Sequence, residues 1–273
     1  GSVGIAKSFI DLISDAGADA VKFQMHIADE ESSVKEKFRK KFSSQDKSRW
    51  DYWLRTSFTI KQWRELKRYS EKKNLVFLCS PFSSKAVEIL NNFKIDAWKI
   101  ASGEFSNNLL LEKILKLSKK PLILSTGLSD EKDIKMTIKS LNKKNLCLLQ
   151  CTSQYPTDIK NAGHKYIKKF RDKYNCLTGI SDHTGNINSL IAAVSLGANI
   201  LETHVTFNEK FFGPDTTSSI SFDELKFLCE YSKDFNQIQK SKFSKEKISN
   251  KQKKMVKLFT KSIVLNKDKK KGS

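Results

Sequence analysis

The stretch Gly179–Thr206, GISDHTGNINSLIAAVSLGANILETHVT, decides the fold of this chain. Two short apolar runs, Leu177–Ile180 and Ala198–Leu201, are predicted to be strands, and an apolar helical segment joins them. A strand–helix–strand unit places its two strands parallel and side by side, in a right-handed crossover. A histidine follows each strand, so we expect His183 and His204 at the C-terminal edge of a parallel sheet, where α/β folds bind ligands.

The same alternation of strand and helix extends along the chain. A leading helix over 2–16 is followed by seven strand–helix repeats, spaced by about thirty residues. The remaining strands are predicted over 18–24, 75–79, 97–100, 121–124 and 146–150, and the main helices over 59–72, 84–91, 109–117, 130–141, 166–173, 189–196 and 222–240. This pattern predicts an α/β fold, a TIM (β/α)8 barrel whose first strand is missing. A doubly wound open sheet is the alternative, but no strand is followed by a glycine-rich dinucleotide motif.

Two segments interrupt this regular pattern. Residues 26–56 form a long charged stretch dotted with aromatic residues, which in a compact domain predicts a functional loop or a lid. We expect residues 1–240 to be the barrel and residues 241–273 to be a basic linker that leads into a second, truncated domain. The apolar run Leu258–Leu265 is predicted to be the first strand of that domain.

The chain carries a net charge of +20, with a sequence pI of about 9.6. A nucleic-acid-binding protein is therefore a remote alternative, and steeply salt-dependent binding to DNA or RNA would reveal it. The lysines are spread over helix faces and loops, however, and do not form arginine-rich patches with interleaved aromatic residues. We expect no nucleic-acid partner and interpret the charge as suited to an anionic substrate.

The cysteines and the apolar runs predict the compartment. Five cysteines (79, 147, 151, 176 and 229) form no CxxC pair and no zinc-like spacing, which indicates a reducing environment. A nucleophilic role for Cys79 or Cys151 is disfavoured because neither has a histidine at a predictable offset. The sequence contains no run long enough to span a membrane and no signal peptide, so we predict a cytoplasmic protein without a membrane partner.

Polar side chains gather at the ends of the predicted strands. Lys22 and Lys99 lie near the ends of otherwise apolar strands, where a charge is costly unless it has a partner. Two ammonium groups among many hydroxyls describe a site for a phosphate and a carboxylate. The residues that we expect at this mouth are Lys22, Gln24, Ser80, Ser83, Lys99, Ser102, Glu104, Ser125, Thr126, Thr152, Ser153, Tyr155, Ser181, Asp182, His183, Glu202 and His204.

His183 and His204 are the candidate metal ligands, because imidazole binds borderline divalent ions. The neighbouring carboxylates Asp182 and Glu202 could orient the rings, and His26 could join them from the long loop. Two protein ligands leave an open, exchangeable site of the kind that polarises a substrate carbonyl.

Eight short motifs, nearly all at strand ends, resemble the sialic acid synthase family, which includes N-acetylneuraminate, legionaminate and pseudaminate synthases. The resemblance covers nearly the whole chain. The motifs are VKFQ (21–24), SPFS (80–83), KIASGE (99–104), LSTG (124–127), LLQCTSQYPT (148–157), GISDHT (179–184), ETHVT (202–206) and GPD (213–215).

The resemblance implies a TIM-barrel enzyme, a homodimer. It would condense phosphoenolpyruvate with an open-chain N-acylated amino sugar, N-acetylmannosamine or its 2,4-diacetamido analogue, to a nine-carbon 2-keto acid and phosphate. Carried over by motif, His183 and His204 would bind Mn2+ or Mg2+. The residues that would hold phosphoenolpyruvate are Lys22, Ser80, Lys99, Ser102, Ser125, Ser153 and Ser181. Tyr155 and Asp215 would contact the sugar, and Glu104, Lys99 and Gln24 are the candidate catalytic residues.

Three departures from the family pattern limit what the resemblance implies. The glutamate of the family's first strand is absent, Thr203 stands where relatives carry lysine or arginine, and the C-terminal antifreeze-like domain is truncated. A fragmentary or inactive member of the family is therefore one alternative. Pseudaminate synthase is another, although Ala101-Ser102-Gly103-Glu104 is more similar to the neuraminate and legionaminate branch.

Overall fold

A computed structural model describes residues 1–38, 43, 45–141 and 145–272 of the chain. It divides the chain into two units, Gly1–Phe235 and Asn236–Ser273, which are considered separately here. The first unit contains all the described strands and all the described helices except one, which spans Asn250–Phe259. The helix α10 (Phe222–Gln239) crosses the boundary, and its last four residues belong to the second unit.

The strands of the first unit are all parallel and follow one another in chain order. They are β1 (Ala20–Met25), β2 (Val76–Pro81), β3 (Trp98–Ile100), β4 (Leu122–Ser125), β5 (Leu146–Cys151), β6 (Leu177–Asp182), β7 (Ile200–Val205) and β8 (Ser219–Ile220). β1 pairs with β2, and β3 to β8 form a six-stranded sheet whose first strand lies against β2. No ladder joins β8 to β1 within the part of the chain that the structure describes. This strand order confirms the parallel α/β fold and is that of a TIM-like barrel left open between β8 and β1.

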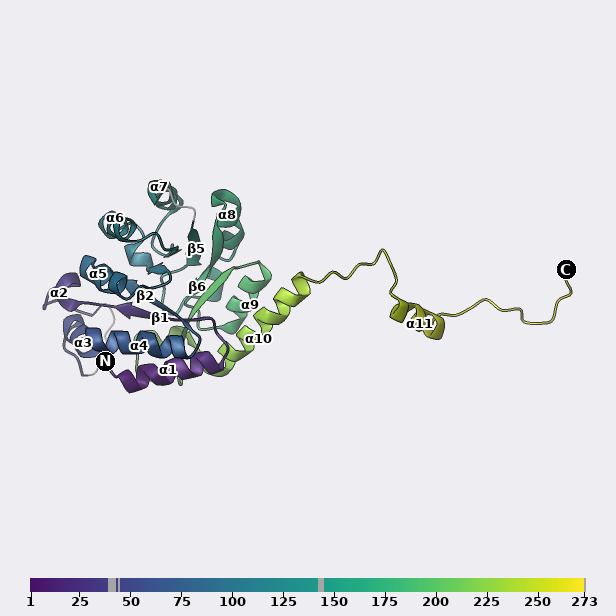
Figure 1. The fold of residues 1–273 in the computed structure, drawn as a ribbon, viewed down its shortest axis with the longest axis horizontal. Helices are drawn as coiled ribbons and strands as arrows, with labels where there is room; N and C mark the ends of the chain where they lie inside the picture. Colours follow the sequence, from purple (N-terminus) through teal and green to yellow (C-terminus); the bar gives the residue numbers. More distant parts are fainter. Residues whose placement is uncertain (39–42, 44, 142–144, 273) are drawn as a thin grey trace. The chain divides into compact units, whose positions relative to one another are not determined.

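Helices surround these strands on their outer side (Figure 1). They are α1 (Val3–Asp15), α4 (Ile60–Lys72), α5 (Ser84–Asn92), α6 (Asn108–Leu117), α7 (Glu131–Leu141), α8 (Lys165–Tyr174), α9 (Ile187–Ser195) and α10 (Phe222–Gln239). Side-chain caps fix where several of them begin. The Thr59 hydroxyl, for example, accepts a hydrogen bond from the Gln62 amide in a reciprocal capping box at the start of α4. The predicted helices are confirmed to within a few residues.

Successive side chains along each strand point to opposite sides, so the buried apolar residues form two clusters. The larger cluster fills the space between strands and helices and takes outward-facing strand residues such as Phe77, Trp98 and Leu148. The smaller one lies inside the barrel and consists of Ile123, Cys147 and Leu149, with Leu78, Ala97 and Ile200 packed against it. The inward positions that follow these residues along their strands carry the polar side chains of the predicted mouth.

The histidine unit differs from its prediction in one respect. The predicted strand Ala198–Leu201 is observed as β7, which begins at Ile200 and continues to Val205, so His204 lies within the strand and not after it. The ladder between Ser181 and Glu202 and between Asp182 and Thr203 extends the pairing this far. Gly179 makes the close approach possible, because a Cβ there would lie 1.9 Å from the Ile200 carbonyl oxygen.

The long segment after β1 is partly helical, which the sequence pattern did not predict. It contains α2 (Ala28–Glu31) and α3 (Arg49–Thr56), and Ser48 caps α3 through a capping box with Asp51. Four short elements complete the unit: three 3-10 turns, η1 (Ser102–Glu104), η2 (Ile159–Asn161) and η3 (Thr216–Ser218), and the two-residue strand β8.

Beyond the end of α10, the second unit contains α11 (Asn250–Phe259) and no other regular structure among its described residues. The predicted strand over Leu258–Leu265 is wrong, because Leu258 and Phe259 end this helix and the described residues that follow belong to no strand. Ile263, Val264 and Leu265 are fully or largely exposed, and a single strand with no ladder cannot satisfy its backbone groups. The domain to which this run was assigned stays a prediction. No described helix of the chain is long and apolar enough to cross a membrane.

Candidate active site

The centre of the barrel mouth is an ion-pair network that joins three strands. The Glu202 carboxylate lies 3.3 Å from Lys22 Nζ and 3.4 Å from Lys99 Nζ, with Oε1 as the shared atom. The same oxygen accepts a 2.7 Å hydrogen bond from the Ser181 hydroxyl, and Lys99 Nζ donates to Ser125 Oγ at 2.8 Å. The structure therefore brings four predicted residues together around one carboxylate.

Burial makes this network costly to leave unpaired. The side chain of Lys99 is 2% exposed and that of Glu202 is 14% exposed. Burial lowers the pKa of Lys99, although the nearby Glu202 carboxylate opposes the shift. Burial by itself would raise the pKa of Glu202, but Lys22 and Lys99 outweigh it and hold that pKa well below its usual range. The carboxylate is therefore ionised at neutral pH.

Hydroxyl groups without partners lie beside the lysines. The Ser80 and Ser153 hydroxyls are buried and make no hydrogen bond to any described residue. Ser102 Oγ accepts a 3.1 Å hydrogen bond from the Gly127 amide. A Cβ at Gly127 would lie 2.4 Å from Ser153 Oγ and 2.8 Å from Ser102 Oγ, so these groups converge on one small space. Buried donors without partners are expensive, and convergent donors beside ammonium groups are what an anion requires.

The two histidines face each other across β6 and β7. Their ring centroids are 5.4 Å apart and the rings are inclined by 28°. His183 Nδ1 lies 3.0 Å from the carbonyl oxygen of Thr152, which can only accept, so Nδ1 carries a proton and Nε2 is the nitrogen with the lone pair in the neutral imidazole. Burial would lower the pKa of His183, but the contact with Cys151 outweighs it and the pKa is raised. Burial, Lys22 and His183 lower the pKa of His204 to about 3, so that its imidazole is neutral at neutral pH.

The metal site expected at these rings stays a prediction, and it would have two imidazole ligands from the chain. Across residues 1–38, 43, 45–141 and 145–272, no third histidine, cysteine, aspartate or glutamate joins them in a group that could hold a metal. Glu202 is paired with the lysines and Asp182 accepts from Thr184 and Ser189, so neither carboxylate acts as a neighbour that orients the rings. A cation here would take its other ligands from water or substrate.

The predicted sugar-contacting residues border the histidines. The Tyr155 ring lies 4.2 Å from the His183 ring and 6.4 Å from the His204 ring, measured between centroids. Burial raises the pKa of Asp215, while His183 and Lys22 act in the opposite direction, which places this carboxylate in the electrostatic field of the same site. The side of the mouth nearest the histidines therefore offers a ring and a carboxylate to a polar substrate.

Glu104 and Gln24 occupy more open positions. Glu104 accepts a 2.7 Å hydrogen bond from Asn107 Nδ2, and burial together with the Glu31 carboxylate raises its pKa. A carboxyl group with a raised pKa can exchange a proton closer to neutral pH than an ordinary one. The Gln24 side chain is exposed, and the structure does not bring it into a described hydrogen bond.

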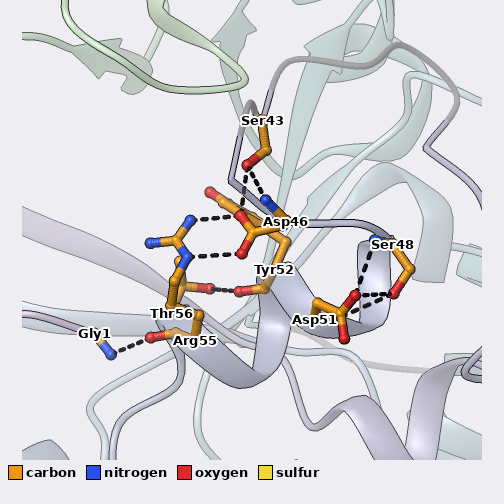
Figure 2. A network of polar contacts seen from close by, with 8 residues as sticks. All are labelled: Gly1, Ser43, Asp46, Ser48, Asp51, Tyr52, Arg55 and Thr56. Carbon is orange, nitrogen blue, oxygen red and sulfur yellow. Dashed lines mark hydrogen bonds and ion pairs between the residues drawn. The ribbon is translucent and has the colours of Figure 1, made fainter.

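A polar network holds the end of the segment after β1 in place (Figure 2). Arg55 donates to both oxygens of Asp46, at 2.8 and 2.7 Å, and Asp46 also accepts from the Ser43 hydroxyl at 2.6 Å. The Gly1 amino group donates to the Arg55 carbonyl oxygen at 2.8 Å. Nearby, the His26 ring is stacked between Trp53, at 4.8 Å, and the Phe82 ring, at 4.1 Å. The predicted lid stays a prediction, and its residues 39–42 and 44 lie outside the described residues.

His26 does not join the other histidines as a ligand. Its Nδ1 lies 2.7 Å from a carboxylate oxygen of Glu31, and its ring is held between the two aromatic rings. Neither His183 nor His204 is among the ring contacts described for it.

Cys151 differs from its sequence-based interpretation. The topology supplies a histidine that no sequence offset indicated, since Cys151 Sγ lies 3.7 Å from His183 Nδ1 and Ser102 Oγ donates to the sulfur. Burial would raise the pKa of Cys151, but His183 more than offsets it and the pKa is lowered. Cys79, in contrast, is fully buried, and burial raises its pKa strongly. Cys79 is thus inert in this structure, whereas Cys151 belongs to the wall of the site.

Comparison with known proteins identifies this arrangement. The sequence profile of the NeuB family matches residues 9–245, which is most of the chain. The chain belongs to the NeuB family. The N,N'-diacetyllegionaminic acid synthase of Campylobacter jejuni is 36% identical to this chain over 281 residues, which are 100% of this chain and 83% of the relative.

Other NeuB relatives carry related names. A pseudaminic acid synthase from Campylobacter jejuni is 32% identical over 84% of this chain and 68% of its own length. The human N-acetylneuraminate-9-phosphate synthase is 31% identical over 84% of this chain and 65% of its own length. Among solved structures, the N-acetylneuraminic acid synthetase of Leptospira borgpetersenii, determined with citrate, matches with a TM-score of 0.77 at 26% identity, covering 94% of this chain and 86% of that one. The NeuB relatives are synthases of sialic, legionaminic and pseudaminic acids, which confirms the family resemblance.

Glu202 is the residue of the NeuB site whose role the sequence reasoning missed. It was placed at the mouth but was interpreted as a neighbour of the histidines, not as a partner of the lysines. The period-two alternation of ETHVT carried the signal, because it places Glu202 and His204 on the same, inward side of β7.

Proposed function

We propose that this NeuB-family chain condenses phosphoenolpyruvate with an open-chain N-acylated amino sugar, giving a nine-carbon 2-keto acid and phosphate. One observation carries the proposal. Two ammonium groups, of Lys22 and Lys99, share the inner mouth with the buried, unpartnered hydroxyls of Ser80 and Ser153. Phosphoenolpyruvate offers a phosphate and a carboxylate, which such a set of donors suits.

The residues divide the work between the two substrates. Lys22 and Lys99 would neutralise the anion, and the hydroxyls together with Ser102 would fix its orientation through directional donors. Tyr155 and Asp215 would hold the amino sugar, whose aldehyde carbon would receive the enol carbon. The carbon–carbon bond forms between the aldehyde carbon and the methylene carbon of phosphoenolpyruvate. Water then adds to the carbon that bears the phosphate, and phosphate leaves.

A divalent cation, Mn2+ or Mg2+, would supply Lewis-acid chemistry at the aldehyde when bound. His183 and His204 would hold it, because their rings face each other and the neutral His204 imidazole can donate a lone pair. Glu104 would move a proton to or from water or a sugar hydroxyl, since its raised pKa suits general acid–base work.

The acceptor sugar is proposed as N-acetylmannosamine or its 2,4-diacetamido analogue. The 36% identity to a diacetyllegionaminic acid synthase favours the diacetamido sugar. The 32% identity to a pseudaminic acid synthase leaves pseudaminate synthase as the alternative. Turnover of the chain with each sugar, measured as release of phosphate, decides between them.

Calorimetric titration with phosphoenolpyruvate tests the anion site directly. We expect saturable binding that Lys99→Ala weakens by at least about tenfold, because a charged hydrogen-bond donor is lost from a buried site. Lys119→Ala is the matched control, since it removes the same charge from an exposed position beyond α6 and should leave binding unchanged. If the Lys99→Ala and Lys119→Ala variants bind phosphoenolpyruvate equally well, the proposal of an anion site at this mouth is refuted.

A further inference from the structure

Glu202 makes contacts that neither a metal site nor a substrate-binding role requires. Its Oε1 atom lies between Lys22 Nζ, at 3.3 Å, and Lys99 Nζ, at 3.4 Å, and accepts from Ser181 Oγ at 2.7 Å. These partners come from β1, β3 and β6, so one carboxylate on β7 joins four strands at the level of the mouth. A single oxygen shared by two ammonium groups is the arrangement of a common counter-ion.

The two lysines need such a counter-ion for a physical reason. Like charges repel, and the Lys99 ammonium is almost completely shielded from water. The charged and titratable groups that act on Lys99 are Glu202 and His204 from β7, Lys22 from β1, and Cys147 and Cys151 from β5. Of these, Lys22 disfavours the charged form, and Glu202 is the carboxylate that favours it.

We propose that Glu202 is a positioning residue, a shared counter-ion that holds the ammonium groups of Lys22 and Lys99 together at one anion subsite. The inference rests on the proposed function, which assigns that subsite to phosphoenolpyruvate. Glu202 acts through the lysines and does not donate to the substrate. The shared carboxylate oxygen keeps both ammonium groups at one subsite, where an incoming anion can contact them together.

The substitution Glu202→Gln isolates this role. Glutamine has the same length and its amide oxygen can still accept from Ser181, so the polar contact survives while the negative charge is lost. Without the counter-ion, Lys99 would lose its proton at lower pH, because burial and Lys22 both lower its pKa. The protonated lysine, and with it the attraction for the anion, would then disappear as the pH rises.

The test is calorimetric titration of phosphoenolpyruvate into the full chain at a series of pH values. Wild type should bind with nearly constant affinity from about pH 7 to about pH 9, whereas Glu202→Gln should lose at least about tenfold over that interval. Glu202→Asp, which keeps the charge, should restore the flat profile. Glu209→Gln is the control, since it removes an exposed carboxylate that follows the same strand. A flat profile for Glu202→Gln, or a loss of equal size at every pH, overturns the proposal.

A second measurement separates this inference from the proposed function. NMR titration of 13C-labelled lysine side chains needs no ligand, and Lys99→Met identifies the resonance of Lys99. We expect that resonance to titrate at distinctly lower pH in Glu202→Gln than in wild type, and in Glu202→Asp to follow wild type. If Lys99 titrates identically with and without the carboxylate, Glu202 is not its counter-ion. Failure of wild type to bind phosphoenolpyruvate would instead refute the proposed function and leave the lysine titration to decide on Glu202.

Discussion

Replacing Gly127 by alanine would place one methyl group in the space where the proposed anion donors converge. The added Cβ would lie 2.4 Å from Ser153 Oγ and 2.8 Å from both Ser102 Oγ and Cys151 Sγ. These atoms are ends of short side chains, which can rotate away, so we expect the free energy of unfolding to fall by only about 1–2 kcal/mol.

The cost to binding should be larger than the cost to folding. A hydrogen bond to a charged group contributes about 1.5–3 kcal/mol, and rotation of Ser102 and Ser153 away from the methyl group removes up to two such donors from the anion. We therefore expect Gly127→Ala to weaken phosphoenolpyruvate binding by about 3 kcal/mol or more, which is over about 100-fold. Isothermal titration calorimetry measures the affinity, and thermal denaturation measures the folding cost.

Gly103→Ala is the matched control for this prediction. A Cβ at Gly103 would have no atom within 4 Å, although the residue lies next to Ser102 in the 3-10 turn η1. It should therefore leave phosphoenolpyruvate binding and stability unchanged. Binding by Gly127→Ala within about threefold of wild type, with the fold intact, would refute the idea that the donors around Gly127 hold the anion.

Three further substitutions test other parts of the structure. His204→Ala should lower Mn2+ affinity by more than about 100-fold, beyond the usual effect of losing an outer-shell partner, while circular dichroism shows an intact fold; unchanged Mn2+ binding by electron paramagnetic resonance would exclude the histidine pair as the metal site. Gly179→Ala should lower the free energy of unfolding in urea by about 3 kcal/mol, because its Cβ would lie 1.9 Å from the Ile200 carbonyl oxygen and backbone cannot easily move; an unchanged denaturation midpoint would contradict this close approach. Arg55 hydrogen bonds hold the pKa of Asp46 below its usual value, so their stabilisation of residues 26–56 is complete above about pH 4 and is lost as the pH falls through the lowered pKa. Proteolysis of this segment by pepsin should therefore speed up on acidification in wild type, whereas Arg55→Ala should be cleaved rapidly throughout; equal rates for the two proteins at the least acid pH would count against the ion pair.

The sequence predicted the parts of the fold that depend on local periodicity. Short apolar runs alternating with amphipathic helices are typical of a parallel sheet covered by helices, and the seven strands and the main helices predicted over residues 1–240 are found where expected. The boundaries of β7 were less accurate, because Glu202 and His204 made the second half of the strand resemble a loop. Their polarity reflects an inward position at the mouth, which periodicity alone does not reveal.

Contacts between distant segments lay beyond the sequence. The helix α3 in the loop after β1 depends on a capping box, and the Arg55–Asp46 pair then ties it to residues nine positions earlier. The Cys151–His183 contact requires the pairing of β5 with β6, and the Leu258–Leu265 prediction was wrong because apolar character does not create a partner strand. The sequence placed the candidate residues at the strand ends, but it did not show which of them contact one another.

The two apolar clusters lie on opposite sides of the strands, so that residues which pack against the helices alternate with residues which face the mouth. In β7, Leu201 and Val205 pack toward the helices, and Thr203 shares their side, while Glu202 and His204 face inward. Thr203, where the family resemblance implies lysine or arginine, thus lies on the side of β7 that packs toward the helices. Substitutions at the helix-facing positions of such a strand change packing and leave the inward side chains in place. Substitutions at the inward positions change substrate preference and leave the packing against the helices intact.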